Sequence, residues 1–203
     1  MPADTTALFD ERRRGLLKVM LDEGITYAAR GFSDMVGKQL TVSQPQVRLV
    51  PISEVPNLLG GPENEAVGIY LRAHGEISGQ IMLVLAYPKA PELVDLILNQ
   101  PTGTTQTLGA LERSALAELG NLTGSFFLNA VAAFAGIDAR PTPPAVMVDM
   151  AGAILDIVVA SYDAVAKHML MLQVAFISAG REAQADFWII PDPATLSAAA
   201  QQL

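Results

Sequence analysis

The 203-residue sequence contains no cysteine, and this absence removes several kinds of site at once. A disulfide framework, a thiol nucleophile and a thiolate-bound metal ion are all excluded. Histidine is scarce as well, because His74 and His168 are the only two in the chain. A histidine-based metal site or a Ser-His-Asp triad is therefore poorly supplied.

Long apolar runs and an excess of positive charge are also missing. No apolar stretch approaches the roughly 18 residues of a membrane-spanning helix, since Asn129 interrupts the run from Phe126 to Ile137 and Asp156 interrupts the run from Ala151 to Ala160. The N-terminal residues do not resemble a secretory signal. The net charge of −8 disfavours nucleic acid as a partner. We expect a cytoplasmic protein that does not insert into a membrane.

What the sequence does contain is enough apolar material for a sizeable core, with 51% hydrophobic and 17% charged residues. The pattern of elements recurs after about 100 residues. The first half reads as a long helix, an extended segment, a hairpin and a short helix, over Leu8–Gly37, Gln46–Ile52, Ala66–Ala73 with Ser78–Tyr87, and Pro88–Leu98.

The second half follows a polar linker at Thr102–Thr105 and repeats the plan with one additional helix. It reads as a long helix, an extended segment, a short helix, a hairpin and a final helix, over Leu108–Ala135, Val146–Met150, Ala151–Tyr162, His168–Ser178 with Ala183–Ile190, and Pro193–Gln202. We expect an α+β fold with pseudo-twofold symmetry, in which an antiparallel sheet packs against two long helices. Residues 1–203 then form one domain with repeat halves at about 8–99 and 108–203.

The second long helix carries a small polar stripe. Ser114, Glu118 and Asn121 stand at i, i+4 and i+7, so their side chains point to the same side of the helix. Leu116, Ala117, Leu119 and Phe127 should lie toward the other sides. Gly120 and Gly124 flank the stripe, and we expect them to leave a smooth helix surface that another protein can approach closely.

This stripe resembles the motif of the CheC, CheX and FliY phosphatases. The family pattern has Asp or Ser, three residues, Glu, two residues, Asn, then 22 residues and Pro, and Ser114, Glu118, Asn121 and Pro144 match it with the 22-residue gap intact. The segment after Pro144, the duplicated plan and the length resemble CheC over nearly the whole chain. We identify the sequence as CheC-like.

The resemblance implies an activity in chemotaxis, a form of two-component signalling. It implies a hydrolase that removes the phosphoryl group from the phosphoaspartate of a CheY-like response regulator. Asn121 would orient the attacking water, and Glu118 would pair with the regulator's conserved lysine. Ser114 and Pro144 would support the site. The regulator would supply the Mg²⁺, so we expect no cofactor and no metal site in this chain itself.

The first half departs from the family pattern. CheC proteins often carry a second motif on the first long helix, but here Leu17, Leu21 and Gly24 occupy the positions of the polar residues, and Pro45 follows Gly24 after 21 positions. We expect one functional site.

Two alternatives stay open from the sequence. The Ser114 hydroxyl can take part directly or can bond the preceding turn of its own helix, while Pro144 shapes the chain after the helix. The whole protein can instead be a non-catalytic regulatory module that binds a receiver domain or a CheD-like deamidase. Asp149 and Asp156 are too few ligands to indicate a metal site.

Overall fold

The computed structural model describes residues 24, 26, 27, 30, 33, 41–43, 46–76, 78–135, 138–160, 168–178 and 180–192. Three predictions therefore lie wholly or largely outside the described residues: most of the first long helix, with Leu17 and Leu21; the position of Pro45; and the final helix over Pro193–Gln202. The remaining predicted elements can all be compared with the structure.

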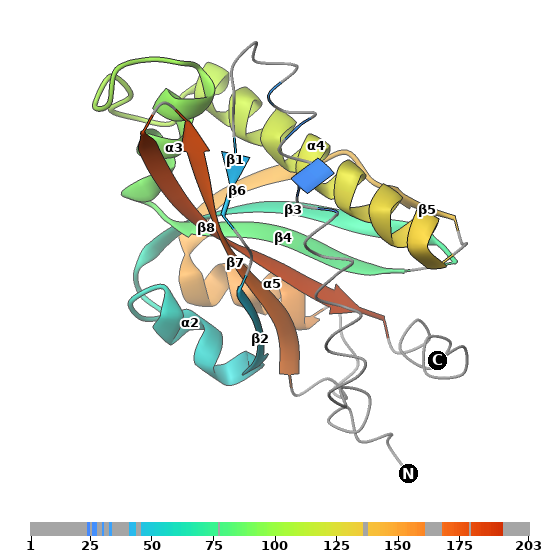
Figure 1. Cartoon of the computed structure of the whole chain (residues 1–203). Coiled ribbons are helices and arrows are strands. Elements are labelled where there is room, and N and C mark those ends of the chain that lie inside the picture. The colour runs from blue at the N-terminus through green and yellow to red at the C-terminus, as the bar shows by residue number, and fades with distance from the viewer. Residues whose placement is uncertain are drawn as a thin grey trace.

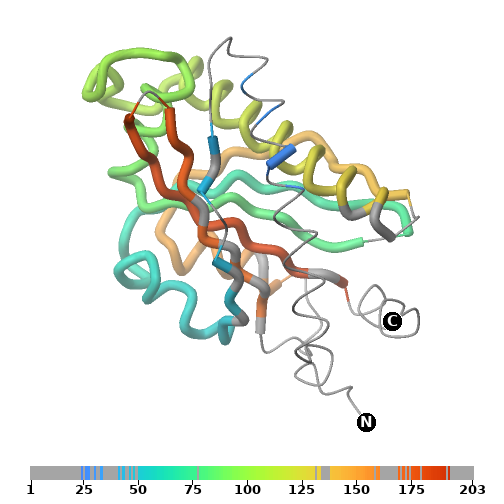
Figure 2. Tube along the Cα trace, in the orientation of Figure 1, coloured from blue at the N-terminus to red at the C-terminus, as the bar shows by residue number. Residues whose placement is uncertain are grey.

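Two long hairpins form the centre of an eight-stranded sheet within the described residues. One hairpin consists of β3 (Glu65–Gly75) and β4 (Gly79–Ala86), and the other of β7 (His168–Ser178) and β8 (Arg181–Pro191). Strand β4 pairs antiparallel with β8, so that the two hairpins meet in the middle of the sheet (Figure 2).

The outer strands are exchanged between the two halves of the chain. Strands β1 (Thr41–Val42) and β2 (Gln46–Pro51) pair with β7 of the second half. Strands β5 (Ala139–Pro141) and β6 (Ala145–Met150) pair in the same way with β3 of the first half. This symmetric strand order confirms the predicted antiparallel, pseudo-twofold α+β fold. Strand β5 was not predicted, because it has only three residues and ends in proline.

Helices cover both faces of the sheet (Figure 1). On one face lie α3 (Lys89–Ile97) and α4 (Ala110–Ala135). On the other face lie α5 (Ala151–Ala160) and α2 (Val55–Leu58). Helix α2 consists of a single turn and directly follows the short 3-10 helix η2 (Ile52–Glu54), which the sequence did not predict.

Alternate residues of each central strand point to opposite faces of the sheet and build two separate cores. Phe187 of β8 packs with its ring edge-on to Phe127 of α4, the ring centroids being 5.6 Å apart. The next residue, Trp188, is buried in the core beneath α5. Both aromatic residues thus belong to the interior, as expected of an alternating strand.

A buried carboxylate fixes the linker that leads into α4. Asp95 of α3 is only 1% exposed, and its oxygens accept hydrogen bonds from the backbone N–H groups of Gly103, Thr104 and Thr105 at 2.7, 3.1 and 2.9 Å. Burial of Asp95 would raise its pKa, but the hydrogen bonds from Thr105, Gly103 and Thr104 prevail and hold the pKa below its usual value. The ionised carboxylate is therefore part of the folded structure.

Candidate functional site

Helix α4 presents the polar stripe at the surface. Ser114 and Glu118 are exposed, and Asn121 is half-buried. None of the three side chains makes a hydrogen bond or ion pair with another described residue. The interpretation of Ser114 as bonding the preceding turn is thus not supported, whereas Thr123 on the same helix does donate such a bond to the carbonyl of Leu119.

The stripe borders an open depression of about 420 Å³. One wall comes from α4 and the other from the end of β5 and the segment that joins it to β6. Pro144 thus faces the motif helix across the depression, and the four residues that match the family pattern are brought together in space. The lining residues are Ser114, Ala117, Glu118, Asn121, Pro141, Thr142, Pro143 and Pro144.

Two expectations about α4 are wrong. Gly120 and Gly124 do not border an open surface, because both are buried against β3. A Cβ atom on Gly120 would overlap with Ile69, and one on Gly124 would lie 3.1 Å from Leu71. The glycines serve close packing of the helix on the sheet. Ala117, which was expected to face away from the stripe, lines the depression with it.

The proline-rich wall is fastened to the sheet by Thr142. The backbone N–H of Thr142 donates to the carbonyl of Arg72 at 2.8 Å, and the Arg72 N–H donates back to the Thr142 hydroxyl oxygen at 3.0 Å. From the sequence, Pro144 was expected only to shape the chain after the helix, and the role of Pro141–Pro144 as a wall was missed. The sequence signal for this wall is the density of prolines immediately before Pro144, the residue that matches the proline of the family pattern.

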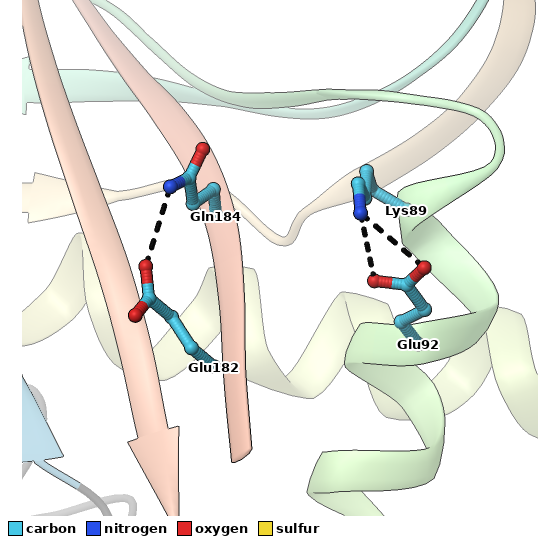
Figure 3. Close-up of polar contacts among 4 residues, drawn as sticks. All are labelled: Lys89, Glu92, Glu182 and Gln184. Atoms are coloured by element: carbon cyan, nitrogen blue, oxygen red, sulfur yellow. Dashed lines mark hydrogen bonds and ion pairs between the residues drawn. The ribbon is translucent and has the colours of Figure 1, made fainter. Parts of the chain in front are cut away.

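The charge at the depression comes from Glu118, the one ionisable side chain among the lining residues. The polar contacts drawn in Figure 3 lie elsewhere: Lys89 pairs with Glu92 on α3 at 3.1 Å, and Gln184 donates to Glu182 on β8. The lining residues thus offer one carboxylate, one amide and two hydroxyl groups, and none of these lining residues is a cation. This set suits the recognition of a cationic group and the orientation of a water.

The described part of the chain contains neither a cluster of metal ligands nor a membrane-spanning helix. No three His, Cys, Asp or Glu side chains there are grouped so that they could hold a metal ion. Asp149 and Asp156 are both exposed. Among the described residues, no helix is both long enough and apolar enough to cross a membrane.

Gly24, from the first predicted helix, lies against α4. It is buried, and a Cβ atom placed on it would lie 3.3 Å from the Cα of Phe127 and 3.3 Å from the Cβ of Ala130. The position at which the family's second asparagine would stand is therefore packed against another helix.

Known proteins resemble both the motif and the fold. The model of the CheC-like family matches residues 111–148, a span that holds the three stripe residues and Pro144. A Bacillus subtilis (strain 168) protein named CheY-P phosphatase CheC is 23% identical over 186 residues, which cover 90% of this chain and 89% of the relative.

Two solved structures share the fold at low sequence identity. FliY from Thermotoga maritima superposes with a TM-score of 0.73 at 16% identity, covering 95% of this chain and 96% of FliY. The FliM middle domain from H. pylori superposes with a TM-score of 0.64 at 10% identity, covering 96% of this chain and all of that domain. Residues 111–148, which carry the motif on α4 and Pro144 of the opposite wall, thus resemble the CheC-like family, and the chain shares its fold with these two solved structures.

Proposed function

We propose that the protein is a phosphatase that hydrolyses the phosphoaspartate of a CheY-like response regulator in chemotaxis signalling. The observation that carries the proposal is the pair formed by Glu118 and Asn121. They stand within one turn of each other on α4 beside an open depression, and their side chains make no hydrogen bond or ion pair with other described residues. The B. subtilis relative, whose name describes this activity, supports the proposal.

In the proposed reaction, water attacks the phosphorus of the regulator's aspartyl phosphate. The bond between phosphorus and the carboxylate oxygen breaks, which releases inorganic phosphate and a free aspartate. The amide of Asn121 both accepts and donates hydrogen bonds, so it can hold the water in line with the breaking bond. Glu118 pairs with a lysine of the regulator and thereby fixes the docked pose.

The division of labour between the two proteins follows from this chemistry. Phosphoryl transfer requires alignment of the nucleophile and compensation of charge, with little covalent work for the helper protein. The Mg²⁺ belongs to the phosphorylated regulator in this scheme, and the phosphatase adds positioning. Ser114 lies one turn before Glu118 and offers a hydroxyl to the regulator, while Pro144 shapes the opposite wall. Such a partner would be met in the cytoplasm.

Acceleration of receiver dephosphorylation is the direct test. A CheY-like receiver from the same organism is phosphorylated with a small-molecule phosphodonor, and loss of the phosphoryl group is followed with and without the protein. The proposal predicts faster decay that saturates with protein concentration. Saturable binding without faster decay would favour a regulatory module for a receiver instead. If the protein neither binds the receiver nor speeds its dephosphorylation but does bind a CheD-like deamidase, a regulatory module for that deamidase would be favoured.

A further inference from the structure

Thr142 is the one residue other than proline in the segment Pro141–Pro144, the wall that faces α4. Proline has no backbone N–H, so Thr142 holds the single backbone donor of the segment Pro141–Pro144. That donor bonds the carbonyl of Arg72. Its hydroxyl oxygen in turn accepts the Arg72 N–H, for which a continuing strand would have offered a carbonyl. The side chain thus completes the ladder where β5 ends.

We propose that Thr142 is a positioning residue of the candidate site, holding the proline wall at a fixed separation from α4 so that the receiver fits between them. The inference rests on the proposed function for the identity of the occupant. Its structural part rests on contacts alone: Arg72 of β3 holds Thr142, and Pro144, two residues on, lies opposite Gly120, where a Cβ atom would come within 3.8 Å of the proline.

Helix α4 and the proline wall are anchored to β3 by different contacts, although α4 also packs directly on β5. Helix α4 is seated on β3 through Gly120 and Gly124, whose contacts with Ile69 and Leu71 do not involve Thr142. Loss of the hydroxyl should therefore move the proline wall and leave Glu118 and Asn121 in place. Binding of the receiver should weaken, whereas the chemical step within the bound complex should proceed at nearly the parent rate.

A purely structural role for Thr142 predicts a different outcome. The bond between Arg72 and Thr142 lies at the surface, where water can replace it, so global stability should change little when it is lost. If Thr142 mattered only for folding, the half-saturating concentration would rise only as far as the fraction of folded protein fell, and the melting temperature would fall with it. A rise in the half-saturating concentration at an unchanged melting temperature cannot arise in that way.

The test compares three variants of the full chain in single-turnover assays with the phosphorylated receiver. Thr142→Val keeps the shape and removes the hydroxyl, Thr142→Ser restores it, and Thr104→Val removes a threonine hydroxyl whose bond to Pro101 lies in a surface turn away from the site. We expect Thr142→Val to raise the half-saturating concentration about fivefold, with the saturated rate within about twofold of the parent. Thr142→Ser and Thr104→Val should match the parent. Unchanged half-saturation in Thr142→Val would overturn the inference.

Backbone amide exchange separates this inference from the proposed function. If the parent protein neither binds nor dephosphorylates the receiver, the proposed function is wrong. Exchange at Arg72 then still decides whether Thr142 holds the wall. It should quicken about fivefold in Thr142→Val and stay near the parent value in Thr142→Ser and Thr104→Val. Equal protection of Arg72 in all of these proteins would contradict the positioning role, whatever the activity.

Discussion

Gly24 and Asn121 lie about one repeat apart in the chain and meet opposite surroundings. Asn121 borders an open depression, whereas Gly24 is buried with Phe127 and Ala130 of α4 against it. An asparagine at position 24 would have no room unless the first segment moved away from α4. A duplicated scaffold thus leaves one position beside an open depression and uses the equivalent position for packing between its halves.

The largest expected effect is the loss of activity in Asn121→Ala. Removing the amide deletes the group proposed to hold the attacking water, and loss of one positioning contact of this kind costs on the order of 100-fold in rate. Single-turnover decay of a phosphorylated receiver at saturating protein measures the effect, with circular dichroism as a check on folding. Asn129→Ala, which alters an exposed asparagine farther along α4, should leave the rate unchanged. Equal rates for Asn121→Ala and the parent would mean that Asn121, like Gly24, takes no part in the chemical step.

Glu118→Gln should weaken docking more than chemistry. The substitution keeps the size of the side chain and removes the charge proposed to meet the receiver's lysine. Loss of a charge-assisted hydrogen bond predicts a rise of about tenfold in the half-saturating receiver concentration, and the effect should shrink at high salt. A titration at two ionic strengths measures both. Glu92→Gln, whose partner is Lys89 on α3, is the matched control, and an identical response from it would remove Glu118 from the interface.

Gly120→Ala should mainly reduce stability. The added methyl group would overlap with Ile69 of β3, so α4 would have to shift, at a cost of about 1–3 kcal/mol in the free energy of unfolding. Urea denaturation measures this cost, and Gly124→Ala, with its looser 3.1 Å contact to Leu71, should lose less. A stable Gly120→Ala protein would mean that the glycines do not fix the height of the helix above the sheet.

Asp95 makes part of the stability depend on pH. Because its folded pKa is depressed, its stabilisation is fully present above the unfolded pKa of about 4 and is lost as the pH falls through the folded value. Asp95→Asn should lower the unfolding free energy at neutral pH by about 1–2 kcal/mol. The substitution should also make the free energy of unfolding fall less steeply as the pH is lowered into the acid range. Thermal melts between neutral pH and acid pH test both parts, and parallel declines in the two proteins would contradict this role.

Gly24→Ala should have the smallest effect of the five. Alanine gains about 1 kcal/mol of helix propensity over glycine, while the 3.3 Å contacts with Phe127 and Ala130 must relax by a few tenths of an ångström to admit the methyl group. These effects oppose each other, so the net change in stability should stay within about 1 kcal/mol. Receiver dephosphorylation should stay within about twofold of the parent. A large fall in turnover of folded Gly24→Ala protein would contradict a single site on α4.

The sequence allowed prediction of the hairpins, α4 and the motif, because each follows from a local pattern. Alternating strands and the spacing of Ser114, Glu118 and Asn121 are visible without knowledge of distant contacts. The orientation of Gly120 was mispredicted, since a glycine in a helix fits close packing and an open surface equally well. The role of Thr142 was missed because it depends on Arg72, 70 positions earlier in the chain.

The exchange of outer strands has a consequence for how the protein is made. Thr41 of β1 contacts Ile177 of β7 across 136 positions of sequence. When the first half leaves the ribosome, β1 and β2 have no strand to pair with until most of the second half has been synthesised. Contacts between such distant segments slow folding and leave strand edges exposed during it. A newly made chain should therefore remain vulnerable to aggregation until β7 emerges, and its two halves should acquire their final structure together.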